Sequence, residues 1–298
     1  MYKDKASHFY LITTIILWSA TPAFATIALK ELNNFQLLFY VCIIATISLF
    51  IAVLLSKRLP ILMNYSKKDI ITMSFMGIIG IFFYHICLFG SFTCAPAGQV
   101  NVANYLWPIF IIIFSVPILK EKFNFLTIIA VIISFAGVFL SLTRGKFSDF
   151  DPQHILGYLL ASLGAVLYGL FSVLGKKYNY DRITSMCVYY ASSTILIIPT
   201  TLIVTEIVIP KTPSTIISLL ILGIIMNSVA FIMWFKALHI GHTHTTANTV
   251  YIIPFLAMIW TFLLNNEPFS MASLAGLVLI IIGISIQTGN RIHKRRIL

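Results

Sequence analysis

Ten long apolar runs follow one another along the chain, separated by short polar segments. Each run is close to the length of about 20 residues with which a helix crosses the hydrocarbon core of a bilayer. Lipid offers no hydrogen-bonding partner to an unpaired backbone, so each run is predicted to be a transmembrane helix. The ten runs are 8–29, 35–55, 70–90, 97–119, 124–143, 154–175, 183–206, 214–238, 245–264 and 270–288.

The polar segments between the runs are too short to hold a separate soluble domain. The longest of them, residues 144–153, lies between the fifth run and the sixth. We therefore expect an all-α membrane protein that consists of two five-helix halves, residues 1–146 and 147–298.

The two halves resemble each other when the first is shifted by 146 residues without a gap. Because five is an odd number, the second half enters the membrane from the opposite side. Two inverted repeats around a site near the midplane are a recurrent architecture of secondary transporters. Trp18 corresponds to Tyr168 at a looser spacing. The matched positions include Gly77-Ile78-Ile79 with Gly223-Ile224-Ile225, Phe89 with Phe235, Tyr105 with Tyr251, Pro108 with Pro254, Glu121 with Glu267, Phe123 with Phe269 and Gly137 with Gly283.

Basic residues are distributed unequally between the two sides of the predicted bundle. When the loops are assigned alternately to the two sides, fifteen Lys and Arg residues fall on one side and four on the other. Cytoplasmic loops carry the excess of positive charge, so both termini are expected in the cytoplasm. The unequal distribution of Lys and Arg arises from this alternating assignment only if the number of helices is even. It thus supports the count of ten.

The composition agrees with a chain whose solvent is lipid. Hydrophobic residues make up 59% of it and charged residues only 10%, against roughly a quarter in soluble domains. The net charge of +11 is carried by short loops, where it sets topology and contacts anionic lipid, so no nucleic-acid partner is expected. The four cysteines have no metal-binding spacing, and the histidines of segment 239–244 have no acidic or Cys companion. Neither a metal nor a cofactor is expected.

The motifs of the repeat resemble those of the drug/metabolite transporter superfamily, in its ten-helix EamA-type branch. The resemblance covers nearly the whole chain and implies a central cavity, transport of a small-molecule substrate, and neither ATP hydrolysis nor any other enzyme activity. Segment 104–108 is similar to that of YddG-type exporters of aromatic amino acids, which adds Tyr105 and Trp107 to the candidate site. The motifs are Leu17-Trp18-Ser19, the series Pro108, Glu121, Gly137 and Pro254, Glu267, Gly283, the segment Asn104-Tyr105-Leu106-Trp107-Pro108, and Trp234-Phe235-Lys236-Ala237-Leu238.

The fourth run carries the most unusual polar pattern. Asn101, Asn104 and Pro108 recur at spacings of three and four residues and so share one helix face. Lipid would reject two amides, so this face is expected to point into the protein. Pro108 cannot donate a backbone hydrogen bond, which frees the carbonyl of Asn104. The patch either lines a substrate cavity or holds neighbouring helices together.

Further candidates lie inside other runs. Trp18 and Ser19 are at mid-span, where a Trp does not belong to an interfacial belt. His85 is the clearest ionisable group within a span, either a substrate or proton ligand or a neutral partner for another helix. Glu121 and Glu267, at helix junctions, are interpreted as helix caps or hairpin contacts. The remaining substrate-binding candidates are Tyr84, Tyr168, Trp234, Asn248 and Tyr251.

These observations favour a secondary transporter in a bacterial-type inner membrane, in contact with membrane lipids. Aromatic rings beside amides suit a flat, amphipathic solute, and the best hypothesis is an exporter of amino acids, aromatic ones included, that works by alternating access. The alternatives are a carrier of another solute (a cationic drug, choline, a nucleoside or S-adenosylmethionine) and, from another class, a membrane-embedded transferase. Asp149 and Asp151 are the only close acidic pair that the transferase hypothesis could use.

Overall fold

The computed structural model describes residues 2–95, 97–122, 125–143, 152–265 and 271–297, and the regular secondary structure in these ranges is entirely helical. Eight helical segments are long and apolar enough to cross a membrane, and two shorter apolar helices accompany them at Phe125–Leu140 and Leu274–Ile286. The structure therefore confirms an all-helical membrane protein. The predicted boundary between the halves, Glu267 and the pair Phe123 and Phe269 lie outside the described residues.

The helices of the first half begin where the sequence offers N-caps or prolines. Asn33 and Gln36 exchange side-chain and backbone hydrogen bonds and start α3, and Ser66 and Asp69 do the same for α5. The first half contains α1 (Tyr2–Ser19), α2 (Thr21–Ala28), α3 (Asn34–Leu55), α4 (Leu59–Met63), α5 (Lys67–Gly77), the π-helix η1 (Ile78–Phe83), α6 (Tyr84–Cys94), α7 (Ala97–Asn104), α8 (Trp107–Leu119) and α9 (Phe125–Thr143).

The second half repeats several helix starts of the first. Helices α12, α13 and α15 begin at residues 213, 230 and 253, each 146 residues after the starts of α5, α6 and α8 at residues 67, 84 and 107. The second half contains η3 (Pro152–His154), α10 (Ile155–Lys177), α11 (Arg182–Val204), α12 (Pro213–Leu220), the π-helix η4 (Ile221–Val229), α13 (Ala230–Ile240), α14 (Thr243–Thr249), the 3₁₀-helix η5 (Val250–Ile252), α15 (Ile253–Asn265) and α16 (Met271–Ile297).

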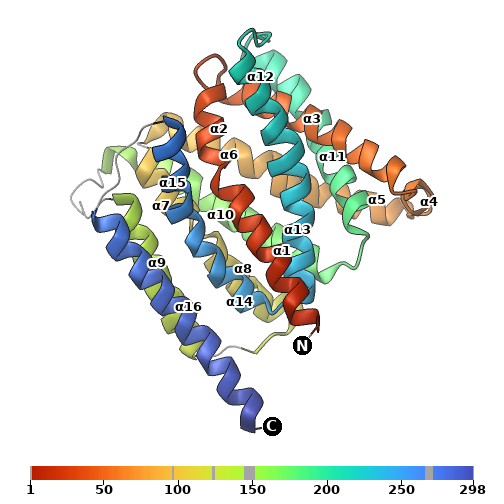
Figure 1. The fold of residues 1–298 in the computed structure, drawn as a ribbon. Helices are drawn as coiled ribbons and strands as arrows, with labels where there is room; N and C mark the ends of the chain where they lie inside the picture. The colour runs from red at the N-terminus through yellow and green to blue at the C-terminus, as the bar shows by residue number, and fades with distance from the viewer. Residues whose placement is uncertain (1, 96, 123–124, 144–151, 266–270, 298) are drawn as a thin grey trace.

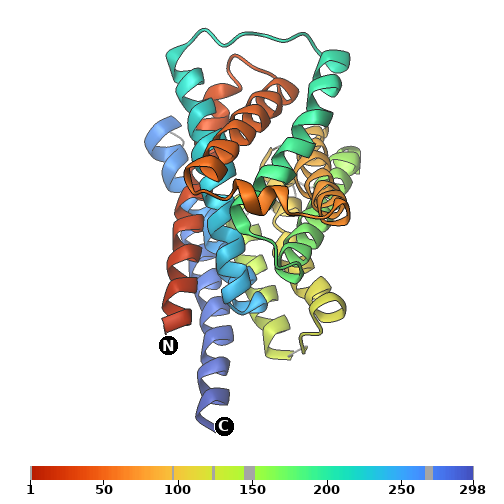
Figure 2. The same ribbon diagram turned by 90° about the vertical axis from the view of Figure 1, so that its right-hand side faces the viewer.

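Helices of the two halves pair with one another across the molecule. The closest associations join α9 with α16, α3 with α11, α1 with α13, and α10 with α6 and α8. Figure 1 shows α9 and α16 side by side and antiparallel, and both ends of the chain lie at the lower end of the molecule in Figures 1 and 2. The halves are thus intertwined rather than separate, and any cavity between helices is shared by both.

The packing of α9 on α16 is reciprocal. A Cβ on Gly137 would lie 2.5 Å from the carbonyl oxygen of Gly276, and a Cβ on Gly283 would lie 2.5 Å from that of Ala130. Gly283 follows Gly137 by 146 residues, and Gly276 follows Ala130 by the same number. Small residues allow backbones to approach this closely in membrane helices, where apolar side chains gain nothing by leaving lipid.

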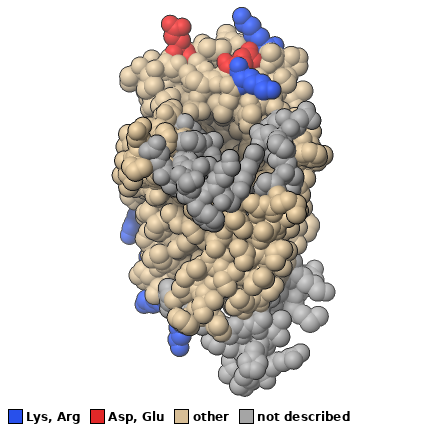
Figure 3. Space-filling model, turned by 90° about the vertical axis from the view of Figure 1, so that its left-hand side faces the viewer, with Lys and Arg blue, Asp and Glu red and all other residues tan. Residues whose placement is uncertain are grey.

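The surface suits a lipid environment. Large apolar side chains such as Phe9, Ile71, Ile195 and Leu202 are exposed. On the face shown in Figure 3, charged side chains lie at the top and along the lower left, and most of the described surface between them is uncharged. The connection 205–212 crosses the upper end of the molecule in Figure 2.

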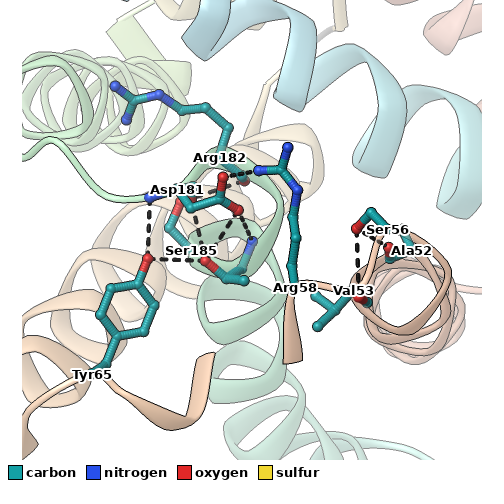
Figure 4. Close-up of polar contacts among 9 residues, drawn as sticks. Ala52, Val53, Ser56, Arg58, Tyr65, Asp181, Arg182 and Ser185 are labelled. Atoms are coloured by element: carbon teal, nitrogen blue, oxygen red, sulfur yellow. Dashed lines mark hydrogen bonds and ion pairs between the residues drawn. The ribbon is translucent and has the colours of Figure 1, made fainter. Parts of the chain in front are cut away.

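A polar cluster joins the halves at the loops between α3 and α5 and between α10 and α11. Arg58 forms an ion pair with Asp181, whose backbone N–H donates to the Tyr65 hydroxyl at 3.1 Å (Figure 4). Asp181 also caps α11 by accepting the backbone N–H of Thr184 at 3.1 Å. One carboxylate therefore fixes the start of a second-half helix and attaches it to the first half.

The glycine contact between α9 and α16 gives a stability prediction. Gly137→Ala should lower stability by about 1–3 kcal/mol, because the new methyl group would meet backbone that cannot move aside. Thermal unfolding of the purified protein in detergent measures the effect. Gly90→Ala is the matched control, since its Cβ would meet only Leu160 at 3.7 Å. Equal unfolding temperatures for the two variants would contradict the tight contact.

Candidate functional site

A cavity of about 460 Å³ lies between the halves. Its lining includes Pro22 and Thr26 of α2, Leu29 directly after that helix, and Asn34 at the start of α3. These positions are at the end of the molecule that lies opposite the termini in Figure 1. The cavity therefore extends toward that end. Eight of the thirteen predicted substrate-binding residues line it, namely Trp18, Tyr84, His85, Asn101, Asn104, Tyr105, Trp107 and Tyr168.

Trp18 is the centre of an aromatic cluster at the cavity. Its ring centroid lies 5.1 Å from that of Phe231, 6.3 Å from that of Tyr168 and 6.4 Å from that of Trp107. The Trp18 indole N–H donates to the carbonyl oxygen of Met226 at 3.2 Å, so its rotation is fixed by η4 of the other half. The chain is also interrupted here, because α1 ends at Ser19 and α2 starts at Thr21 with a Pro in its first turn. The cluster presents rigid aromatic surface to a solute.

The break between α7 and α8 brings polar groups to the cavity. The backbone N–H of Leu106 turns back to the carbonyl of Ala103 at 3.2 Å, in the short pattern of a tightened turn. Pro108 then occupies the first turn of α8, where its missing N–H breaks no helical bond. Asn104, at the end of α7, is only 7% exposed, yet its Oδ1 accepts no hydrogen bond among the described residues. Its acceptor is therefore available to a bound solute.

His85 lines the cavity from α6. Its Nδ1 lies 2.6 Å from the carbonyl oxygen of Ile81, and a carbonyl can only accept, so Nδ1 carries the proton. Nε2 of a neutral ring is then an acceptor. Its ring centroid lies 4.7 Å from that of Tyr84 and 5.5 Å from that of Phe89. The bond to Ile81 lies within one span, since Ile81 belongs to η1 and His85 to α6, which continues it.

Helix η4 adds a polar side chain, Asn227, that was not among the predicted site residues. Asn227 lines the cavity, donates to the carbonyl of Leu222 at 2.9 Å and accepts from the Tyr190 hydroxyl at 2.7 Å. The widened π-turn leaves carbonyls for side chains five residues on, and Ser228 uses that of Gly223 in the same way. The sequence does carry a signal for Asn227, because lipid would reject an amide in the middle of run 214–238 just as it would reject Asn104.

Five predicted residues lie outside the cavity lining. Ser19 is buried and accepts from the Trp260 indole at 3.0 Å. Trp234 is buried behind the aromatic cluster, 5.5 Å from Trp18 between ring centroids. Pro108 is buried at the start of α8. Asn248 and Tyr251 are fully buried in α14 and η5.

The cavity carries no formal charge, since none of its lining residues is Asp, Glu, Lys or Arg. It can bind a solute through ring contacts and through amide and hydroxyl hydrogen bonds, but its lining has no carboxylate to pair with a cationic group. Within the described residues, no group of three or more His, Cys, Asp or Glu side chains is placed to hold a metal ion.

Glu31 organises the end of the molecule at which α2 and α3 meet. Its carboxylate accepts the backbone N–H of Lys211 at 2.5 Å and the hydroxyl of Thr212 at 2.7 Å. These hydrogen bonds lower the pKa of Glu31 from 4.5 to about 2. A carboxyl group with a depressed pKa stabilises the fold fully above pH 4.5 and loses that effect as the pH falls toward 2.

A bundle of membrane-crossing helices around a central cavity is the architecture of a membrane transporter. A sequence profile described as the EamA-like transporter family matches residues 5–143 and 155–288, and the chain belongs to this family. The predicted resemblance is thus confirmed, and the protein is a multi-pass membrane transporter.

Individual relatives agree with this assignment. The chain is 27% identical over 282 residues to an uncharacterized transporter of Archaeoglobus fulgidus, covering 93% of this chain and 96% of that protein. It is 32% identical over 104 residues, 34% of its length, to the aromatic amino acid exporter YddG of Ancylobacter novellus, of which this match covers 36%. A solved crystal structure superposes with a TM-score of 0.84 at 22% identity, over 95% of this chain and 98% of the other, which shows a shared fold.

Two of the cavity amides, Asn227 and Asn104, are predicted to differ in their structural importance. Asn227→Leu should destabilise the protein by about 1–3 kcal/mol, because it leaves the buried Tyr190 hydroxyl without its acceptor. Asn104→Leu should cost less, about 0.5–1 kcal/mol, since its Oδ1 is already unpaired and only the hydrogen bond of its amide with Tyr84 is lost. Thermal unfolding in detergent compares them. A larger loss for Asn104→Leu would show that its amide holds the helices together.

Proposed function

We propose that the protein is a secondary carrier of small amphipathic metabolites, amino acids and aromatic amino acids among them, and that it works by alternating access. The observation that carries this proposal is the uncharged cavity, in which an aromatic cluster around Trp18 adjoins the unpaired acceptor of Asn104. Rings contact the apolar part of such a solute, and amides bond its amino and carboxylate groups.

The proposed architecture has ten spans in two inverted repeats, residues 1–146 and 147–298. The family profile matches the chain in two segments, 5–143 and 155–288, which supports two repeats. The shared offset of 146 residues in the starts of three helices supports it as well. If each half adopts the conformation of the other, the cavity opens to the opposite side of the membrane, which is alternating access.

The proposed location is a bacterial-type inner membrane, with both termini in the cytoplasm. The excess of basic residues on the side of the termini supports this orientation. The cavity of this conformation then faces away from the cytoplasm, as in an exporter that has released its solute. Similarity to the exporter YddG over a third of the chain supports the direction and the solute class.

Counterflow in proteoliposomes tests the proposed function. Vesicles containing the purified protein are preloaded with aromatic amino acids, other amino acids, quaternary amines or nucleosides, and uptake of the same radiolabelled solute is followed. We expect exchange with Phe, Tyr or Trp and none in protein-free vesicles. If all three fail while another class exchanges, the aromatic assignment is wrong; if no class exchanges, carrier function is wrong.

Asn104 is predicted to be necessary for solute binding. Asn104→Leu should weaken half-saturation of exchange by about 10- to 100-fold, the loss expected for a hydrogen bond to a charged group. Asn179→Leu is the matched control, because Asn179 is exposed in the loop before α11 and does not line the cavity. Unchanged half-saturation for Asn104→Leu would remove Asn104 from the site.

A further inference from the structure

Two buried polar side chains in α14 and η5 have no hydrogen-bond partner among the described residues. Asn248 is 0% exposed, and neither its amide nitrogen nor its oxygen finds a partner among the described residues. The Tyr251 hydroxyl is likewise buried and unpaired. Unpaired buried polar groups cost free energy and are rare, so each demands an explanation. We call Asn248 and Tyr251 the concealed pair.

Residues in the equivalent part of the first half line the open cavity. Tyr105 precedes Tyr251 by 146 residues, and each follows a short helix, α7 or α14. Each also lies where its span is interrupted, at the turn after Asn104 or in η5. Tyr105 nevertheless lines the cavity, whereas Tyr251 is fully buried. The residue that precedes Asn248 by 146 positions is Val102, which is buried outside the lining, so the comparison concerns the tyrosines. At these tyrosines the two halves share a local structure but differ in exposure.

We infer that the concealed pair is a second part of the substrate site, which opens toward the side of the termini when the cavity closes on the other side. This inference rests on the proposed alternating access and names the residues that meet the solute in the opposite conformation. Its ligand is the same amphipathic solute, whose amino and carboxylate groups bond the Asn248 amide and the Tyr251 hydroxyl. The Asn248 amide and the Tyr251 hydroxyl therefore lack hydrogen-bond partners only in the conformation in which the solute does not reach them.

A network at the end of the molecule nearest the termini closes this second part. The Glu121 carboxylate lies 3.3 Å from the Lys176 ammonium and 3.4 Å from Nε2 of His244, and it accepts the Thr243 hydroxyl. Lys176 also donates to the Thr243 hydroxyl at 2.6 Å and to the carbonyl of Gly241 at 3.1 Å. We call Glu121, Lys176, Thr243 and His244 the Glu121 latch.

The Glu121 latch ties the start of α14 to the end of α8. Lys120 ends α8 in the left-handed conformation, and the backbone N–H groups of Lys120 and Glu121 both return to the carbonyl of Ser115. The Ser115 hydroxyl contacts Nε2 of His244 at 3.0 Å. Thr243 and His244 begin the helix that carries Asn248, so holding them against α8 keeps that helix in its closed position.

Cysteine labelling tests whether opening the latch exposes the concealed pair. Single cysteines replace Asn248, Tyr251 or Tyr105 in a background with Cys42, Cys87, Cys94 and Cys187 changed to Ala, and a water-soluble maleimide reports access in detergent. With the latch intact, we expect Tyr105→Cys to react and Asn248→Cys and Tyr251→Cys to remain unlabelled.

Lys176→Met should reverse this pattern. We expect labelling at position 248 or 251 to rise about tenfold and labelling at position 105 to fall. Lys177→Met is the matched control, since Lys177 is exposed and lies next to Lys176 but outside the latch, and it should change nothing.

A fall at position 105 with no rise at 248 or 251 would overturn the concealed site while leaving the carrier intact. No change at any position would overturn the latch and the inference with it. Counterflow by the wild type, measured separately, decides the proposed function.

Discussion

The structure depends on one constraint, which is that a backbone in lipid must satisfy its own hydrogen bonds. An interrupted helix is tolerated only where protein or a cavity encloses the free groups. Here Val250 and Tyr251 of η5 are fully buried, and η4 and the turn after α7 supply cavity residues. Irregular backbone and solute binding therefore coincide for a physical reason. The same groups that lipid would reject are those that can hold a polar solute.

Close packing makes this enclosure possible. The glycines of α9 and α16 bring two spans together backbone to backbone, and each contact has its counterpart in the other half. The cavity itself is not symmetric, because residues of the first half supply most of its lining. The two halves are similar in sequence but contribute unequally to the cavity. Two polar clusters, around Asp181 and around Glu121, join the halves at loops on the side of the termini.

Much of this organisation could be predicted from the sequence, because lipid imposes simple rules on apolar length and polar placement. The spans, the offset of 146 residues and the interrupted fourth run with Asn104 all follow from such rules. Asn227 was missed because the π-turn that exposes it changes the helical register, and a regular helix was assumed. Glu121 was interpreted as a cap or hairpin contact, but the structure pairs it with Lys176 and His244 of the other half. Such pairing depends on how the halves meet, which spacing along one chain does not encode. For the same reason, the sequence could not separate Tyr105 from Tyr251.

The uncharged lining of the cavity has an energetic consequence. A fixed charge that moved across the membrane would exchange about 2.3 kcal/mol with each 100 mV of potential. For the zwitterionic amino acid of the proposed function, a site without Asp, Glu, Lys or Arg would displace no net charge when it changes sides. The membrane potential would then do no work on the loaded protein, and the difference in solute concentration between the two compartments would set the direction of flow.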